Sequence, residues 1–190
     1  MTRTSECRCL SHSSNEKTVR AKGPGKPGPF VIYYPSIMSN QLRATYRIAD
    51  ADAMAALGEK MGCLSRPGDL ILLNGPLGAG KTIFVQGVGK ALGISDVTSP
   101  TFVISRIHQG LIPLIHVDVY RLLEAGNAAA YLDDLDLDSA REDGLTVIEW
   151  GGAESARLSD DRLEITIDRS NEERVVTISA VGPRWDGVEL

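Results

Sequence analysis

The sequence predicts an α/β fold with three layers, in which helices cover both faces of a mixed β-sheet that ends in an antiparallel hairpin. Three observations lead to this prediction. Strand-like and helix-like apolar patterns alternate from Thr45 onward. A glycine-rich turn joins the apolar run Leu70–Asn74 to a helical pattern that begins near Lys81. The two final runs, Leu163–Ile167 and Val175–Ser179, alternate with a period of two around a polar turn, as hairpin strands do.

The other elements follow from the same patterns in chain order. We expect a strand over Thr45–Ile48 and then a helix over Asp50–Gly62, with Asp50 as its N-cap. The helix that runs from Lys81 to Leu92 ends at Gly93, a residue suited to the left-handed conformation that closes many helices. Strand, strand, helix and strand then follow at Phe102–His108, Leu114–Val119, Leu122–Glu142 and Leu145–Ile148. The resulting sheet is parallel around the glycine-rich turn and antiparallel at one side.

We divide the 190-residue chain into an N-terminal extension (1–40), one domain (41–183) and a C-terminal tail (184–190). The extension is basic and rich in Gly, Pro and Ser, so it cannot bury enough apolar surface to fold. Three interpretations of it stay open: a disordered tail, an organelle transit peptide, or sequence upstream of a true translation start at Met38.

Charge and cysteine usage narrow the class of function. Residues 1–43 hold seven Lys/Arg and two acidic side chains, whereas residues 44–190 hold thirteen and twenty-three. An acidic domain gains little from counterion release, so tight free-standing binding to DNA or RNA is disfavoured. The three cysteines, Cys7, Cys9 and Cys63, match neither a disulfide framework nor a metal site and fit a reducing cytoplasm. No run approaches the ~18 apolar residues of a membrane span, so we expect a cytoplasmic protein without membrane contact.

Residues Gly75–Thr82 read GPLGAGKT between a strand and a helix, and this predicts a phosphate-binding P-loop. Glycines permit a tight turn in which backbone N–H groups and the helix N-terminus point at a β-phosphate. Lys81 then reaches the β- and γ-phosphates, and Thr82 reaches a magnesium ion. The expected fold is therefore P-loop NTPase-like, and the expected ligand is a nucleoside triphosphate.

Magnesium chemistry also needs a carboxylate at the carboxyl end of a neighbouring strand. Asp118 and Glu149 each follow an apolar strand pattern, and the sequence alone does not rank them. Strand alternation puts His116, Asp118 and Tyr120 on one face. For His116 and Tyr120, hydrogen bonding beneath the site is the plainer interpretation.

Thr101 is a further candidate, because it follows the P-loop helix and a rigid corner made by Ser99 and Pro100. A hydroxyl at this place is either part of an ordinary turn or a switch-like group that senses the γ-phosphate or its magnesium.

Four motifs together resemble the bacterial TsaE (YjeE) family, the small ATPase of tRNA threonylcarbamoyladenosine (t6A) synthesis. In chain order they are Leu77–Thr82, Thr98–Phe102, His116–Arg121 and Glu149-Trp150. The resemblance covers Thr45 to about Ser179. Many ATPases share the P-loop, but the four motifs in this order are specific to the family.

The resemblance implies an ATP- and magnesium-dependent ATPase, slow alone and stimulated by partner proteins. The partner is the TsaB–TsaD complex, in which TsaD transfers threonylcarbamoyl to the adenosine 3′ of the anticodon, and tRNA is reached indirectly through that complex.

The resemblance also assigns roles. Lys81 becomes the phosphate clamp, Asp118 the residue that couples or activates hydrolysis, and Thr101 a switch-like catalytic residue. Thr82 and Glu149 become the magnesium ligands. Trp150 becomes a packing or contact residue. The nucleotide-binding residues are Gly75, Gly78, Ala79, Gly80, Lys81, Thr82 and Ile83.

Two positions depart from the family pattern. Pro76 stands where Asp is common, which removes a backbone donor and a carboxylate near the phosphates. Ile83 stands where Thr is frequent, which removes a hydroxyl that could meet the α-phosphate. We expect altered ATP affinity with binding retained.

Other readings of the sequence remain. A stand-alone P-loop kinase of small molecules is the main alternative, although no long Arg-rich lid insertion follows the P-loop. A nucleotide-dependent interaction module would use the same residues, and a GTPase is disfavoured because no Asn-Lys-x-Asp motif occurs. The acidic run Leu132–Asp138 is either a solvated face or a docking surface in which Asp133 and Asp134 meet a basic partner.

Overall fold

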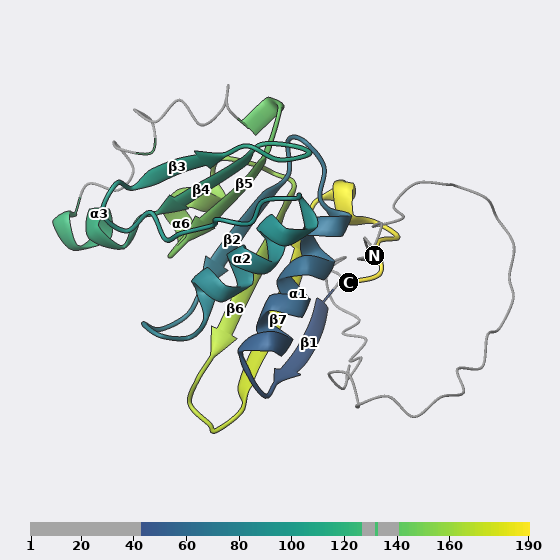
Figure 1. The fold of residues 1–190 in the computed structure, drawn as a ribbon, viewed down its shortest axis with the longest axis vertical. Helices are drawn as coiled ribbons and strands as arrows, with labels where there is room; N and C mark the ends of the chain where they lie inside the picture. Colours follow the sequence, from purple (N-terminus) through teal and green to yellow (C-terminus); the bar gives the residue numbers. More distant parts are fainter. Residues whose placement is uncertain (1–42, 127–131, 133–140) are drawn as a thin grey trace, which may run out of the picture.

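The computed structural model describes residues 43–126, 132 and 141–190 (Figure 1). Within these residues, seven strands form one sheet in the order β1-β7-β6-β2-β5-β4-β3. The strands are β1 (Arg43–Ile48), β2 (Leu70–Asn74), β3 (Ser105–His108), β4 (Leu114–Asp118), β5 (Leu145–Glu149), β6 (Arg162–Asp168) and β7 (Arg174–Val181). The helices are α1 (Ala51–Leu64), α2 (Lys81–Ala91), α3 (Tyr120–Ala125), α6 (Ala153–Ala156) and the 3₁₀ helix η1 (Pro183–Trp185).

The predicted α/β fold with a mixed sheet and a C-terminal hairpin is confirmed. The four central strands β6, β2, β5 and β4 run parallel, and β6 pairs with β7 as the expected antiparallel hairpin. The sequence predicts antiparallel pairing at one side, and the structure adds a second antiparallel pair, β3 with β4, at the opposite edge. A short connection such as the one from His108 to Leu114 can only reverse the chain.

The first antiparallel strand starts later than its sequence pattern indicates, at Ser105 instead of Phe102. The N–H groups of Val103 and Ile104 both donate to the carbonyl of Pro100, at 2.8 and 2.6 Å. This turn holds the chain away from the sheet until Ser105.

The next strand ends earlier than expected, at Asp118, and Tyr120 begins α3. Alternation predicts that Tyr120 shares a strand face with His116. This prediction is wrong, because Tyr120 belongs to α3. The cause is local: the Asp118 carboxylate accepts the N–H of Tyr120 at 3.0 Å, which turns the chain into a helix. α3 then ends at Gly126, which has φ 74°.

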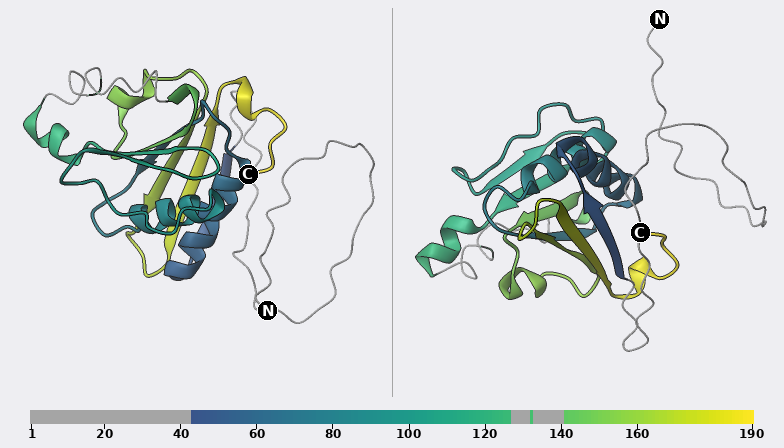
Figure 2. Two further views of the ribbon diagram at one scale, coloured as in Figure 1. Left: turned by 45° about the horizontal axis from the view of Figure 1, so that its top comes forward. Right: turned by 90° about the horizontal axis from the view of Figure 1, so that it is seen from below.

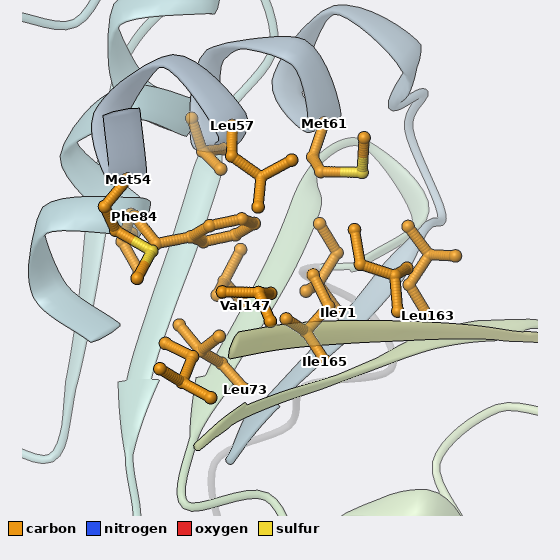
Figure 3. Packing of buried hydrophobic residues seen from close by; sticks show 14 of the residues in the cluster. Met54, Leu57, Met61, Ile71, Leu73, Phe84, Val147, Leu163 and Ile165 are labelled. Atoms are coloured by element: carbon orange, nitrogen blue, oxygen red, sulfur yellow. The ribbon is translucent and has the colours of Figure 1, made fainter. Parts of the chain in front are cut away.

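The main core lies between the sheet and helices α1 and α2. Met54, Leu57 and Met61 point from α1 toward the sheet, and Phe84 of α2 enters the same layer (Figure 3). They meet side chains of three parallel strands, Ile71, Leu73, Val147, Leu163 and Ile165. Asp50 caps α1 as expected, because its carboxylate accepts the N–H of Ala53 at 2.8 Å.

The opposite face of the sheet carries a smaller apolar cluster. Leu70 and Leu72, which alternate with the main-core residues of β2, pack there with Leu132. Ala156 of α6 adds to this cluster, and α6 lies across the sheet from α1 and α2 (Figure 2). The three-layer arrangement is thus present, with one layer much thinner than the other.

Helices α1 and α2 approach one another closely enough to need glycine at two positions. A Cβ at Gly58 would overlap the Phe84 carbonyl oxygen, and one at Gly87 would overlap the Ala55 carbonyl oxygen. The backbones therefore touch, and the position of α2 is set by α1 as well as by the sheet.

Residues 184–190, expected from the sequence to form a tail, pack onto the domain. Trp185 and Leu190 are buried in the main core. Arg184 forms a two-pronged ion pair with Asp69, at 2.8 and 2.7 Å, and donates to the Leu64 carbonyl at 3.0 Å. In the sequence, this segment shows only one Arg and one Trp among polar residues. That pattern does not reveal that Arg184 pairs with Asp69, 115 residues away.

No helix in the described part of the chain is long and apolar enough to cross a membrane. The N-terminal extension and the acidic residues Asp133 and Asp134 lie outside the described residues.

We expect Arg184→Met to lower the free energy of unfolding by about 3 kcal/mol, because it leaves the buried Asp69 carboxylate without its partner. Urea unfolding at pH 7 measures this. The matched control is Arg47→Met, which breaks the exposed ion pair with Glu173 and should cost less than about 1 kcal/mol. Equal losses in the two variants would show that the buried pair does not hold the C-terminal segment.

Candidate functional site

The glycine-rich turn lies between β2 and α2, at the carboxyl edge of the parallel strands. Gly80 is the N-cap of α2 with φ 108°, a conformation that side-chain-bearing residues rarely adopt. Lys81 begins the helix, and its ammonium donates to the carbonyls of Gly75 at 2.8 Å and Pro76 at 3.1 Å. The loop thereby curls around the lysine.

Lys81 is buried in spite of its charge. Its ammonium lies 3.7 Å from the centre of the Trp150 ring, a cation–π contact. Burial lowers the pKa of Lys81, and the charges of Glu149 and Asp118 oppose that shift. The ring of Tyr120 in turn packs on Trp150, with the ring centres 4.9 Å apart.

Thr82 and Glu149 meet across the site. The Thr82 hydroxyl donates to Oε1 of Glu149 at 3.2 Å, and Nε2 of His116 lies 2.9 Å from the same oxygen. His116 is completely buried on β4. Because Glu149 Oε1 accepts the Thr82 hydroxyl, the second contact is an N–H donation from His116 to a carboxylate that is itself 3% exposed. Glu149 is therefore held in one orientation.

Asp118 joins two segments. One carboxylate oxygen accepts the Thr101 hydroxyl at 2.5 Å, and the other accepts the N–H of Tyr120. The Thr101 hydroxyl also lies 2.7 Å from that of Ser99. The Ser99–Thr101 corner is thus tied directly to the end of β4.

Two residues with unfavourable backbone conformation flank these groups. Within the described ranges, Ile104 (φ 69°) and Trp150 (φ 64°) are the non-glycine residues with positive φ. The Ile104 carbonyl accepts the N–H of Asp118, and Trp150 donates its N–H to Leu73, both at 2.8 Å. These hydrogen bonds maintain turns that would otherwise relax, and the second brings the indole over Lys81.

The structure therefore brings together the P-loop residues, Thr101, Asp118 and Glu149. Ala79 is the buried residue of the loop and belongs to the main core, and Ile83 is half-buried and packs against that core. In the described part of the chain, no group of three or more His, Cys, Asp or Glu forms a self-contained metal site. Thr82 and Glu149 nevertheless offer hard oxygen donors side by side, which suits a Mg²⁺ that takes its other ligands from phosphates and water.

Sequence patterns missed some contacts at the site. The alternation of β4 singles out His116, but only the three-dimensional register reveals that it bonds to Glu149 on the next strand. Arg169, in the turn between β6 and β7, donates to the Leu77 carbonyl of the P-loop at 3.3 Å. No motif marks it.

Comparisons with known proteins give a consistent result. A family model described as "Threonylcarbamoyl adenosine biosynthesis protein TsaE" matches residues 48–176. A Streptomyces coelicolor protein named tRNA threonylcarbamoyladenosine biosynthesis protein TsaE is 45% identical over 141 residues, which are 70% of this chain and 93% of that protein. The Bacillus subtilis protein of the same name is 36% identical over 145 residues, 74% of this chain and 88% of its own. The crystal structure of Bacillus subtilis YdiB has a TM-score of 0.64 at 32% identity and covers 80% of this chain and 93% of its own.

The nearly buried His108 gives a pH prediction. Burial lowers its pKa, with smaller contributions from His116 and Arg106, so the unfolded chain binds its proton more tightly than the folded protein. Stability should fall as pH drops from about 6.5 toward the lowered pKa. His108→Phe keeps the ring and removes this contribution, so its stability should fall less between pH 7 and 5 in urea unfolding. Parallel pH profiles for the variant and the wild type would contradict the assignment.

Proposed function

The chain belongs to the TsaE family, and on that premise we propose that it is a magnesium-dependent ATPase that acts in t6A modification of tRNA. Its relatives are named for the biosynthesis of this modification. Nucleotide binding by the P-loop and hydrolysis of ATP are the steps that we assign to this chain.

The single observation that carries the proposal is the contact between Thr82 and Glu149. A P-loop hydroxyl and a carboxylate from the neighbouring strand, 3.2 Å apart, offer the protein's share of a Mg²⁺ site. Thr82 and Glu149 would hold the ion, which would supply positive charge to neutralise the phosphates. His116 supports this role by fixing the orientation of the Glu149 carboxylate from behind.

The remaining residues supply positioning and proton transfer. Lys81 directs its ammonium at the β- and γ-phosphates while keeping its bonds to loop carbonyls. We assign to Asp118 the role of accepting a proton from the attacking water. We assign to the Thr101 hydroxyl the role of sensing the γ-phosphate. Their mutual bond couples the chemical step to the corner that begins at Ser99.

We propose that the partner is the TsaB–TsaD complex in the cytoplasm, with tRNA reached through it. The acidic composition of residues 44–190 disfavours direct tRNA binding. Two apolar side chains beside the site, Leu77 and Phe102, are 78% and 82% exposed, as expected for a surface that meets another protein.

An ATPase assay tests the function. We expect slow phosphate release by the full chain alone and clear stimulation when TsaB and TsaD are added, with Lys81→Ala inactive in both. Phosphorylation of a small metabolite without stimulation by the partners would favour the kinase instead, and ATP binding without turnover in either mixture would favour an interaction module.

Isosteric variants separate the two carboxylates. Glu149→Gln should make ATP affinity depend less on magnesium, because the charged one of the two side chains that support the ion is replaced by a neutral amide. Asp118→Asn should bind ATP normally and lose about 100-fold or more in kcat. Calorimetric titration with and without EDTA, followed by single-turnover hydrolysis, measures both. Wild-type turnover by Glu149→Gln would remove Glu149 from the metal ligands.

A further inference from the structure

The end of β6 and the turn that follows it lie against the P-loop. A Cβ at Gly75 would lie 2.7 Å from the Ile167 carbonyl oxygen, and one at Gly78 would lie 2.8 Å from a guanidinium nitrogen of Arg169. Arg169 also donates to the Leu77 carbonyl at 3.3 Å. The guanidinium therefore lies directly against the backbone of the loop, where glycine at position 78 leaves room for it.

Hydrogen bonds on both sides of Arg169 fix the conformation of the turn. The carboxylate of Asp168 accepts the N–H of Ser170 at 2.8 Å and its hydroxyl at 2.9 Å, and these bonds hold the pKa of Asp168 below its usual range. Arg169 stands between these two residues. Within the described residues, its guanidinium forms no ion pair.

The candidate site holds more negative than positive charge, so a second cation near the phosphates would be favourable. Lys81 faces the carboxylates of Glu149 and Asp118, so one ammonium meets two negative groups before a nucleotide adds its phosphates. Magnesium would compensate on the side of Thr82 and Glu149. Arg169 stands on the other side, because β6 and β5 flank β2 on opposite sides.

We propose that Arg169 is a further nucleotide-binding residue, which contacts the phosphate tail from the side of the P-loop opposite Thr82 and Glu149. This inference rests on the proposed function. The planar fork of a guanidinium suits phosphate oxygens, and its bond to Leu77 is long enough to be exchanged at little cost. Charge-assisted bonds of this kind correspond to about 10- to 100-fold in affinity.

Calorimetric titration of the full chain with Mg-ATP and with Mg-tripolyphosphate tests the proposal. Arg169→Ala should weaken both ligands at least 10-fold, with the melting temperature of the ligand-free protein unchanged. Arg169→Lys keeps the charge and should recover part of the affinity. Arg169→Gln can still donate to Leu77 but carries no charge, so it should bind as weakly as Arg169→Ala. The matched control is Arg43→Ala on β1, which removes an exposed charge that bonds only to Ser179 among the described residues and should leave both affinities unchanged.

Each contrary result has a distinct meaning. Wild-type affinity in Arg169→Gln would show that the residue only positions the loop through Leu77. Weaker binding of ATP with unchanged binding of tripolyphosphate would show that the residue contacts the nucleoside. Either result overturns the proposal. Unchanged binding by Arg169→Ala would overturn it while leaving the ATPase intact. Failure of the wild type to bind Mg-ATP would overturn the proposed function and this inference together.

Discussion

The backbone contact between α1 and α2 fixes the geometry on which the candidate site depends. Gly58 and Gly87 let each helix touch a carbonyl of the other, so α2 has little freedom to slide or rotate. Lys81 and Thr82 occupy the first turn of α2, and a shift of that turn would move both relative to the strand ends. The buried side chains of α1 and Phe84 then hold the pair against the sheet. A close contact between two helices thus determines where a phosphate could lie.

The parallel register supplies the other half of the site. β5 lies between β2 and β4, and Glu149 is in register with both Leu73 and Asp118. The two carboxylates consequently come from adjacent strands at the same edge, beside the helix N-terminus. Because His116 precedes Asp118 by two residues, it points to the same face and reaches Glu149 from below. The register of β4 with β5 therefore fixes the relative positions of Glu149, its hydrogen-bond donor His116 and the second carboxylate, Asp118.

Most of this arrangement was accessible from the sequence, and the exceptions share a cause. Alternating patterns indicated the strands, and the P-loop with the acids after two strands indicated which residues would lie together in the candidate site, because these depend on local spacing. The early helix at Tyr120 and the buried Arg184 depend on contacts that spacing does not encode. Tyr120 starts a helix because of a carboxylate two residues earlier, and Arg184 is buried because of Asp69. The contact of Arg169 with the P-loop belongs to the same class.

Asp118 links the candidate site to the protein surface by two routes. Thr101 donates to it from the corner before Phe102, and the N–H of Tyr120 donates to it from the start of α3. These segments meet again at the surface, where the Arg121 guanidinium lies 4.5 Å from the centre of the exposed Phe102 ring. A ligand that drew the Thr101 hydroxyl away from Asp118 would loosen the first route and leave the second in place. The Ile104 carbonyl and the Arg121 guanidinium would still hold the Phe102 corner to Asp118 and α3, so the change that a partner could detect at that surface would be local to Thr101.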